Sequence, residues 1–149
     1  MPDTVRIRPL QSSDKPEWII LFKAYITFYK ATVADDVIEE TWQRLLSGEE
    51  HVHRCLIAAD DKDRPIGLAH ILFHRSTWSK TWYCHLEDLF VRQDIRAKGV
   101  GEALIKAVYA AADARQAGRV YWSTQETNYR ARALYDKVAT KSPFLQYRR

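Results

Sequence analysis

Residues 86–101 constrain the fold most, because an apolar strand leads there into a short basic turn and then directly into a helix. The helix is indicated by apolar residues that recur at a period of about 3.6, namely Val100, Leu104, Ile105, Val108, Ala111 and Ala112. Its amino terminus therefore falls at the turn that contains Gly99 and Gly101. Free N–H groups and the positive end of the helix dipole favour an anion there, and the two glycines let a phosphate group approach the main chain. The segment predicts a phosphate-binding turn.

Two common phosphate-binding motifs do not match this turn. A P-loop requires Gly-Lys-Ser/Thr, whereas here Lys98 precedes Gly99 and Val100 follows it, so the hydroxyl that binds Mg²⁺ is missing. A dinucleotide-binding fingerprint requires a small residue three positions after Gly101, where this chain has Leu104. The sequence therefore argues against both of these nucleotide-binding folds.

A second motif follows a strand-like run over residues 119–124. Asn128 is a good helix N-cap. Ala131, Leu134, Tyr135 and Val138 then fall at positions i, i+3, i+4 and i+7. The spacing predicts a helix that carries Tyr135 on its inward face.

Together the two motifs resemble those of the GNAT superfamily of N-acetyltransferases. The family's Arg/Gln-x-x-Gly-x-Gly/Ala loop is matched by Arg96-x-x-Gly99-x-Gly101, and its Asn-x-x-Ala-x-x-Leu-Tyr helix by residues 128–135. The chain departs from the family where that helix often continues into Gly-Phe, because residues 139–144 read Ala-Thr-Lys-Ser-Pro-Phe. The resemblance extends from end to end and implies a single N-acetyltransferase domain over residues 1–149.

The resemblance implies that acetyl-CoA is the co-substrate and that a primary amine attacks it directly in a ternary complex, without a covalent acyl-enzyme. The strand edge of Leu89, Phe90 and Val91 would run beside the pantetheine. The residues implied in binding the rest of the cofactor are Arg96, Ala97, Lys98, Gly99, Val100, Gly101 and Asn128.

Glu87 is the predicted general base for the attacking amine. A carboxylate within an otherwise apolar strand beside a pocket is expected to have its pKa raised. Asp88 follows directly, and consecutive strand residues point to opposite faces, so one of the two is expected to be solvated. Asp88 or a water chain are the alternatives for the base.

Tyr135 is the predicted general acid for the departing thiolate, because a phenol on the inward face of its helix can donate to sulfur. The alternative is an ordinary core tyrosine. No metal is expected, because the histidines lack the spacing of metal ligands. We expect surface or half-buried imidazoles at His51, His53, His70, His74 and His85.

The acceptor amine is left open by two resemblances that differ. Residues 86–91 are similar to a strand of the diamine (spermidine/spermine) acetyltransferases, whereas residues 135–144 resemble small histone- or amino-acid-modifying acetyltransferases. Four acidic residues near the start of an expected helix could attract a polyamine or a lysine-rich tail, but they equally suit a helix N-terminus. They are Asp35, Asp36, Glu39 and Glu40. The expected acceptor is a small-molecule or peptide amine.

Charge is distributed unevenly along the 149 residues. Residues 1–91 hold 11 Lys/Arg and 14 Asp/Glu, whereas residues 92–149 hold 12 and 5. The basic half contains the glycine turn, which suits a polyanionic cofactor, although scattered solvated charge is the alternative. Two other functions stay open, a GNAT-fold sensor that binds acyl-CoA without turnover and a basic nucleic-acid-binding module.

Other features point to a cytoplasmic protein with no membrane or nucleic-acid partner. No apolar run approaches the ~20 residues of a membrane span, and the first ten residues are too charged for a signal peptide. Cys55 and Cys84 need not be paired. A homodimer is expected.

The predicted fold is of the α/β (α+β) class, with a mixed, mostly antiparallel central sheet. The expected order is one strand, two helices, three strands, then a helix, a strand, a helix and a last strand. The strands are predicted at residues 5–10, 54–59, 65–74, 81–91, 119–124 and 144–148. The first two helices are predicted to start at Asp14 and Asp36, and the second to end at Gly48.

Overall fold

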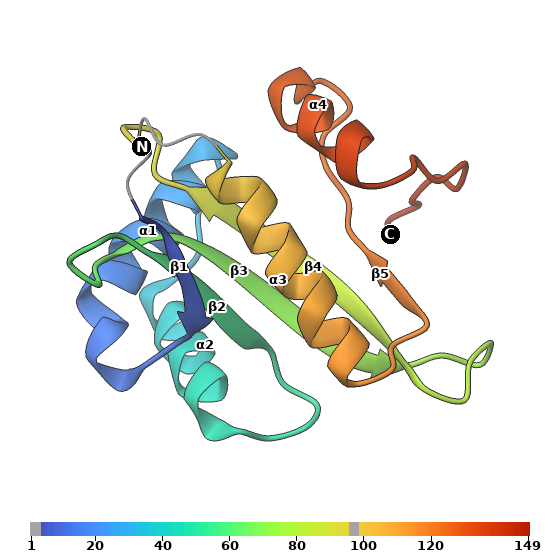
Figure 1. Cartoon of the computed structure of the whole chain (residues 1–149), viewed down its shortest axis with the longest axis horizontal. Coiled ribbons are helices and arrows are strands. Elements are labelled where there is room, and N and C mark those ends of the chain that lie inside the picture. Colours follow the sequence, from blue (N-terminus) through green and yellow to red (C-terminus); the bar gives the residue numbers. More distant parts are fainter. Residues whose placement is uncertain (1–3, 96–98) are drawn as a thin grey trace.

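A computed structural model describes residues 4–95 and 99–149. Arg96, Ala97 and Lys98, three of the predicted cofactor-binding residues, lie outside this range. The elements run in the order β1 (Arg6–Pro9), a 3₁₀ turn (Ser12–Asp14), α1 (Lys15–Phe28), α2 (Asp35–Ser47), β2 (Arg54–Ala59), β3 (Pro65–Arg75), β4 (Trp82–Val91), α3 (Val100–Ala114), β5 (Arg119–Tyr121) and α4 (Tyr129–Val138) (Figure 1).

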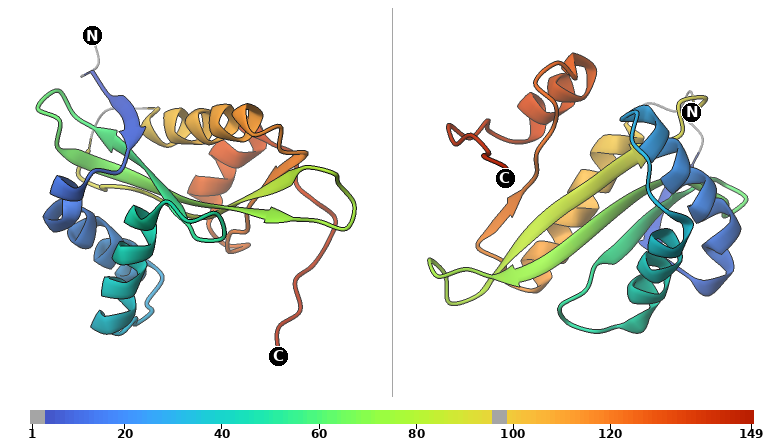
Figure 2. Two further views of the ribbon diagram at one scale, coloured as in Figure 1. Left: turned by 90° about the horizontal axis from the view of Figure 1, so that it is seen from below. Right: turned by 180° about the vertical axis from the view of Figure 1, so that it is seen from behind.

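The strands form one sheet in the order β1-β2-β3-β4-β5, in which every pair is antiparallel except the parallel pair β4 and β5. Helix α3 covers one face, and α1 and α2 cover the other (Figure 2). Each face of the sheet has its own hydrophobic core. Leu104 and Val108 are buried in the core under α3, and Trp18 and Ile38 are buried in the core under α1 and α2. The predicted mixed, mostly antiparallel sheet is confirmed.

Some helix ends follow the expected local signals, but the predicted capping boxes do not: Asp14 precedes α1 without a side-chain cap hydrogen bond, and α2 begins at Asp35, with Ala34 as its N-cap, instead of at Asp36. Pro16 lies in the first turn of α1, where its missing N–H leaves no helical carbonyl unpaired. Helix α2 ends at Gly48, whose φ of 71° is a left-handed conformation that glycine adopts without strain. No helix among the described residues has both the length and the apolar character needed to cross a membrane.

The predicted sixth strand is wrong. Residues 144–148 follow α4 as an extended tail, and within the described residues no strand of the sheet pairs with it. Its apolar side chains stay in solvent, since Phe144 is 88% exposed and Tyr147 is 93% exposed. An extended segment forms a strand only where a hydrogen-bonding partner is in reach, and β5 is too short to offer one.

Strands β4 and β5 diverge after three paired residues. Tyr83 to His85 pair with Arg119 to Tyr121, after which the chain leaves β4, so β5 is shorter than predicted. The rest of β4 has no strand beside it on that edge among the described residues. Helix α4 stands beyond this opening (Figure 1), tied to α3 by the Tyr109 hydroxyl, which donates to the Val138 carbonyl over 2.9 Å. Beyond His85, the edge of β4 that faces away from β3 therefore has no strand partner among the described residues.

Candidate active site

A β-bulge in β4 determines which way the two predicted acids point. His70 of β3 lies opposite Asp88 and Ile71 lies opposite Leu86, so Glu87 is the extra residue of the bulge. The bulge reverses the alternation of side chains, because Leu86 packs on the α3 side of the sheet whereas Phe90 packs on the α1 side. The expectation that Glu87 and Asp88 face opposite sides is therefore wrong.

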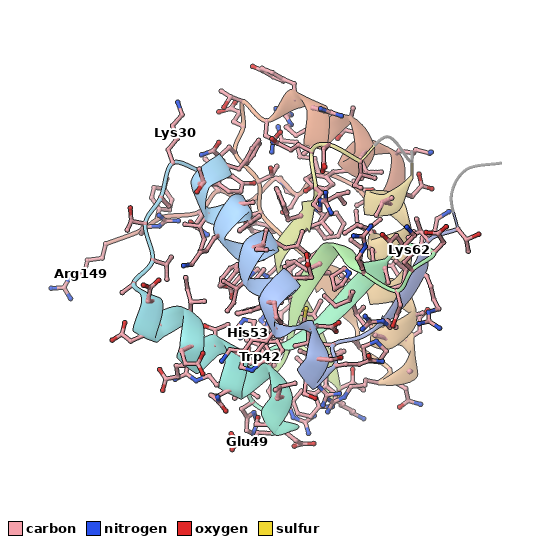
Figure 3. The ribbon with its side chains drawn as sticks, turned by 90° about the vertical axis from the view of Figure 1, so that its left-hand side faces the viewer. Lys30, Trp42, Glu49, His53, Lys62 and Arg149 are labelled. Carbon is pink, nitrogen blue, oxygen red and sulfur yellow. The ribbon has the colours of Figure 1, made fainter. Side chains whose placement is uncertain are left out.

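Both carboxylates line one groove of about 490 Å³. Its walls come from α1, the loop that follows α1, the bulge, the segment after β5 and the C-terminal tail. The tail crosses to the side of α1 and α2 (Figure 2), and its last residue, Arg149, lies on the same side as Lys30 (Figure 3). The groove combines aromatic walls, two carboxylates and one guanidinium, from Tyr25, Tyr29, Glu87, Asp88 and Arg148.

Glu87 forms a hydrogen bond that the sequence did not indicate. Its Oε1 atom lies 2.7 Å from Nε2 of His53, and its side chain is 51% exposed. The hydrogen bond with His53 lowers the pKa of Glu87 and outweighs the opposite effect of burial. The predicted rise of this pKa is wrong, because the hydrogen bond from His53, just before β2, stabilises the ionised carboxylate more than burial disfavours it.

Asp88 is held from inside the protein. Its Oδ2 atom lies 2.8 Å from Nδ1 of His70, and the Trp18 indole N–H donates to Nε2 of the same ring over 3.0 Å. His70 is 2% exposed and Asp88 is 15% exposed. His70 is thus fully buried rather than the surface or half-buried imidazole that was expected.

The inward face predicted for α4 is confirmed. Leu134, Tyr135 and Val138 are half-buried, whereas Ala133 and Asp136 are exposed. Tyr135 packs edge to face on Trp122. Burial, with a smaller effect of Tyr29, raises the pKa of Tyr135 to about 12, so its hydroxyl is protonated at neutral pH.

The two glycines of the turn serve different purposes. Gly99 has a φ of 88°, and a Cβ there would meet no atom within 4 Å, so its site is open but requires the left-handed conformation. A Cβ at Gly101 would come within 3.3 Å of a Leu134 methyl carbon. Gly101 therefore permits close packing of α3 on α4, which differs from the phosphate approach expected of it.

Among the described residues, the first N–H groups of α3 have no hydrogen-bond acceptor. Its first backbone hydrogen bond among the described residues runs from Ala103 N–H to the Gly99 carbonyl. The N–H groups of Val100, Gly101 and Glu102 precede any acceptor within the helix. Asn128 caps α4 as predicted, since its side chain accepts from the Ala131 N–H over 3.4 Å. In the part of the chain that the structure describes, no three His, Cys, Asp or Glu side chains gather as a metal site would require.

Comparison with known proteins agrees with this geometry. Residues 17–139 match the model of the acetyltransferase (GNAT) family. The D-amino-acid N-acetyltransferase HPA3 of Saccharomyces cerevisiae is 33% identical over 147 residues, which cover 99% of this chain and 91% of that protein. A crystal structure of a probable acetyltransferase has a TM-score of 0.84 at 22% identity and covers 96% of this chain and 95% of its own. The aminoglycoside N-acetyltransferase AAC(6')-Iy in complex with CoA has a TM-score of 0.83 at 18% identity, covering 100% and 96%.

The chain belongs to the GNAT acetyltransferase family, because the family model covers most of its length and HPA3 is similar to it from end to end. Its enzyme class is that of the acetyl-CoA-dependent N-acetyltransferases.

Proposed function

We propose that this enzyme transfers the acetyl group of acetyl-CoA to a primary amine by direct attack in a ternary complex. The observation that carries the proposal is the position of Glu87 and Asp88, two carboxylates on one face of a groove beside the open edge of β4. Two carboxylates attract an ammonium group and provide a route for the proton that it must lose before it attacks.

The cofactor fits the features around this edge. Leu89, Phe90 and Val91 pair with β3 on one side, and among the described residues their other edge has no strand beside it, so that edge can pair with the amides of pantetheine. The first N–H groups of α3 suit a pyrophosphate. Arg96, Ala97 and Lys98 complete the proposed phosphate site. Asn128 contributes by fixing the start of α4.

We assign the two carboxylates different roles. Asp88 is only 15% exposed and is held by His70, which suits an anchor for the acceptor ammonium. Glu87 is half-exposed and has a lowered pKa, so it is ionised at neutral pH and can pass a proton on to water. We therefore propose Glu87 as the base. Asp88 or a water chain are the alternatives.

Tyr135 is the proposed acid. The amine nitrogen bonds to the carbonyl carbon, and the C–S bond then breaks. The sulfur leaves as a thiolate and takes the proton of the Tyr135 hydroxyl. Solvent then returns a proton to Tyr135. The raised pKa of Tyr135 keeps its hydroxyl protonated before the reaction. Tyr29 contributes to that rise and also lines the groove, which supports a position of Tyr135 beside the acceptor.

The acceptor that suits the groove best is an amino acid. The groove has Arg148 for a carboxylate in addition to Glu87 and Asp88 for an ammonium group. A relative's description as a D-amino-acid N-acetyltransferase supports this choice. A polyamine, which has no carboxylate, and a protein lysine are the alternatives.

A thiol-release screen with acetyl-CoA tests the proposal. D- and L-amino acids, polyamines, aminoglycosides and lysine peptides are the acceptors. We expect turnover with an amino acid, verified by mass spectrometry of the N-acetyl product. Binding of acetyl-CoA without turnover of any amine would indicate a sensor instead, and affinity for DNA or RNA that falls steeply with salt would indicate a nucleic-acid-binding module.

We further propose that the enzyme acts as a cytoplasmic homodimer. The exposed apolar side chains of Phe144, Leu145 and Tyr147 on the tail support a protein interface. The two buried, unpaired cysteines, Cys55 and Cys84, are compatible with a reducing compartment. Light scattering after size-exclusion chromatography tests the dimer, and a monomer at micromolar concentration would contradict it.

A further inference from the structure

A chain of hydrogen bonds runs from the core to the groove. It begins at Trp18 on α1, passes through His70 on β3 and ends at Asp88 on β4, with lengths of 3.0 and 2.8 Å. Trp18 is 0% exposed and His70 is 2% exposed. The function proposed above gives Trp18 no role, and it mentions His70 only as the partner that holds Asp88.

The identity of the first donor fixes the protons on His70. An indole N–H can donate a hydrogen bond but cannot accept one. Because Trp18 points its N–H at Nε2 of His70, that nitrogen must accept and therefore has no hydrogen. The single ring proton of His70 is then on Nδ1, which donates to Oδ2 of Asp88. His70 is a neutral donor in this arrangement.

We propose that Trp18 and His70 are positioning residues that hold Asp88 in place as a full negative charge for the acceptor's ammonium group. The proposal rests on the function proposed above. His70 engages Oδ2 from the core side, while Asp88 lines the groove in which the acceptor would bind. A protonated His70 would instead cancel the charge of Asp88, and Trp18 prevents this by occupying the second nitrogen.

In the described part of the chain, the groups that pack around His70 supply no positive charge next to Asp88, so a protonated His70 ring would be the nearest one. On β2 it faces Cys55, whose thiol pKa is raised by burial, and on β4 it faces Asp88 and Glu87. On α1 its neighbour Phe22 is apolar, and the pKa of Tyr25 is raised by burial and then by Asp88. His53 also faces this side, but it forms its hydrogen bond with Glu87.

Trp18→Phe tests the proposal because it keeps a six-membered aromatic ring at this position. It removes the five-membered ring of the indole together with its N–H donor. In this variant Nε2 of His70 loses the N–H donor that keeps it free of a proton, so the ring can become doubly protonated. We expect kcat/KM for the amine to fall about tenfold more between about pH 8 and pH 5.5 than in the wild type, mostly through KM. The KM for acetyl-CoA should not change.

Trp42→Phe is the matched control. Trp42, which Figure 3 labels, belongs to α2, is 3% exposed and packs on Trp18 of α1 with ring centroids 5.2 Å apart. Among the described residues its indole donates to no titratable side chain. This variant loses comparable packing and should keep the wild-type pH profile. Equal pH profiles for the two variants would overturn the proposal.

Two further measurements keep the test independent of folding and of turnover. His70→Asn retains an N–H donor for Asp88, whereas His70→Leu does not, so we expect the lower amine KM in His70→Asn. Nitrogen-15 NMR of wild-type histidine rings at neutral pH should show His70 protonated on Nδ1 alone. A proton on Nε2 would overturn the proposal, whether or not any amine is acetylated. If the NMR result is as expected but no amine is acetylated, only the proposed function is contradicted.

Discussion

Tyr135 and Trp122 pack edge to face across the opening between β5 and α4, with ring centroids 5.4 Å apart and ring planes inclined by 72°. This contact holds the phenol in one place while its hydroxyl makes no hydrogen bond to another described residue. A fixed ring with an unengaged hydroxyl is the arrangement that a proton donor to a leaving group requires.

Tyr135→Phe keeps this ring contact and removes the hydroxyl. We expect kcat to fall by roughly 10–10³-fold, and the acetyl-CoA dissociation constant to stay unchanged, because the sulfur gains charge only in the transition state. Stability should change by at most about 1.5 kcal/mol. Steady-state kinetics, calorimetric binding and thermal unfolding measure these quantities.

Tyr129→Phe is the control for this prediction, because Tyr129 lies on the same helix and is 71% exposed. It should leave kcat unchanged. Near-normal turnover of Tyr135→Phe combined with a large loss of stability would make Tyr135 a core residue and require another acid.

Two substitutions of Gly99 distinguish the effect of backbone strain from the effect on phosphate binding. Gly99→Ala should cost about 1 kcal/mol of stability, since its φ of 88° strains any other residue, and it should still be stabilised by acetyl-CoA. Gly99→Glu should lose that stabilisation, because a carboxylate at the start of α3 repels a pyrophosphate. Thermal unfolding with and without acetyl-CoA makes the comparison. Equal ligand-induced shifts in the two variants would place the pyrophosphate elsewhere.

Arg148 is expected to select for a carboxylate on the acceptor. Arg148→Gln should raise KM about tenfold for an amino acid, in keeping with the loss of one charge-assisted hydrogen bond, and leave KM for its decarboxylated amine unchanged. Arg149→Gln is the control from the adjacent position. A similar change in KM for the amino acid and for its decarboxylated amine would show that the tail shapes the groove but that Arg148 does not bind the carboxylate.

The sequence predicted most of the elements because their signals are local. The apolar period of α3, Pro16 in the first turn of α1 and Gly48 at the end of α2 each depend on residues within a few positions. The last strand failed because its formation depends on a distant partner that β5 does not supply.

The site was harder to predict for the same reason. Its two carboxylates were found from Leu-Glu-Asp-Leu, but that pattern does not reveal a bulge, which only the pairing with β3 defines. His53 lies 34 positions from Glu87 and Trp18 lies 52 positions from His70, so no local pattern links these pairs. The pKa of Glu87 is lowered and not raised because of its hydrogen bond with His53, which is distant in the sequence.

The low pKa of Glu87 makes a prediction about the wild-type pH profile. A carboxylate whose folded-state pKa is depressed is ionised above that value and loses its contribution to stability only as the pH falls through it. The His53–Glu87 pair lowers this pKa, so Glu87 should add no acid limb to kcat/KM above about pH 5. The profile of kcat/KM against pH checks this, and an acid limb that disappears in Glu87→Gln would contradict it.

The same profile in Glu87→Gln tests the central claim, that the bulge brings a carboxylate base to the acceptor amine. We predict a deficit in kcat/KM of roughly 10–10²-fold at about pH 6.5, where the amine must lose a proton, shrinking as the pH approaches the amine's own pKa. Glu40→Gln, on the exposed side of α2, is the control and should follow the wild type. A deficit that stays constant across the pH range would contradict the claim and make Glu87 a structural residue.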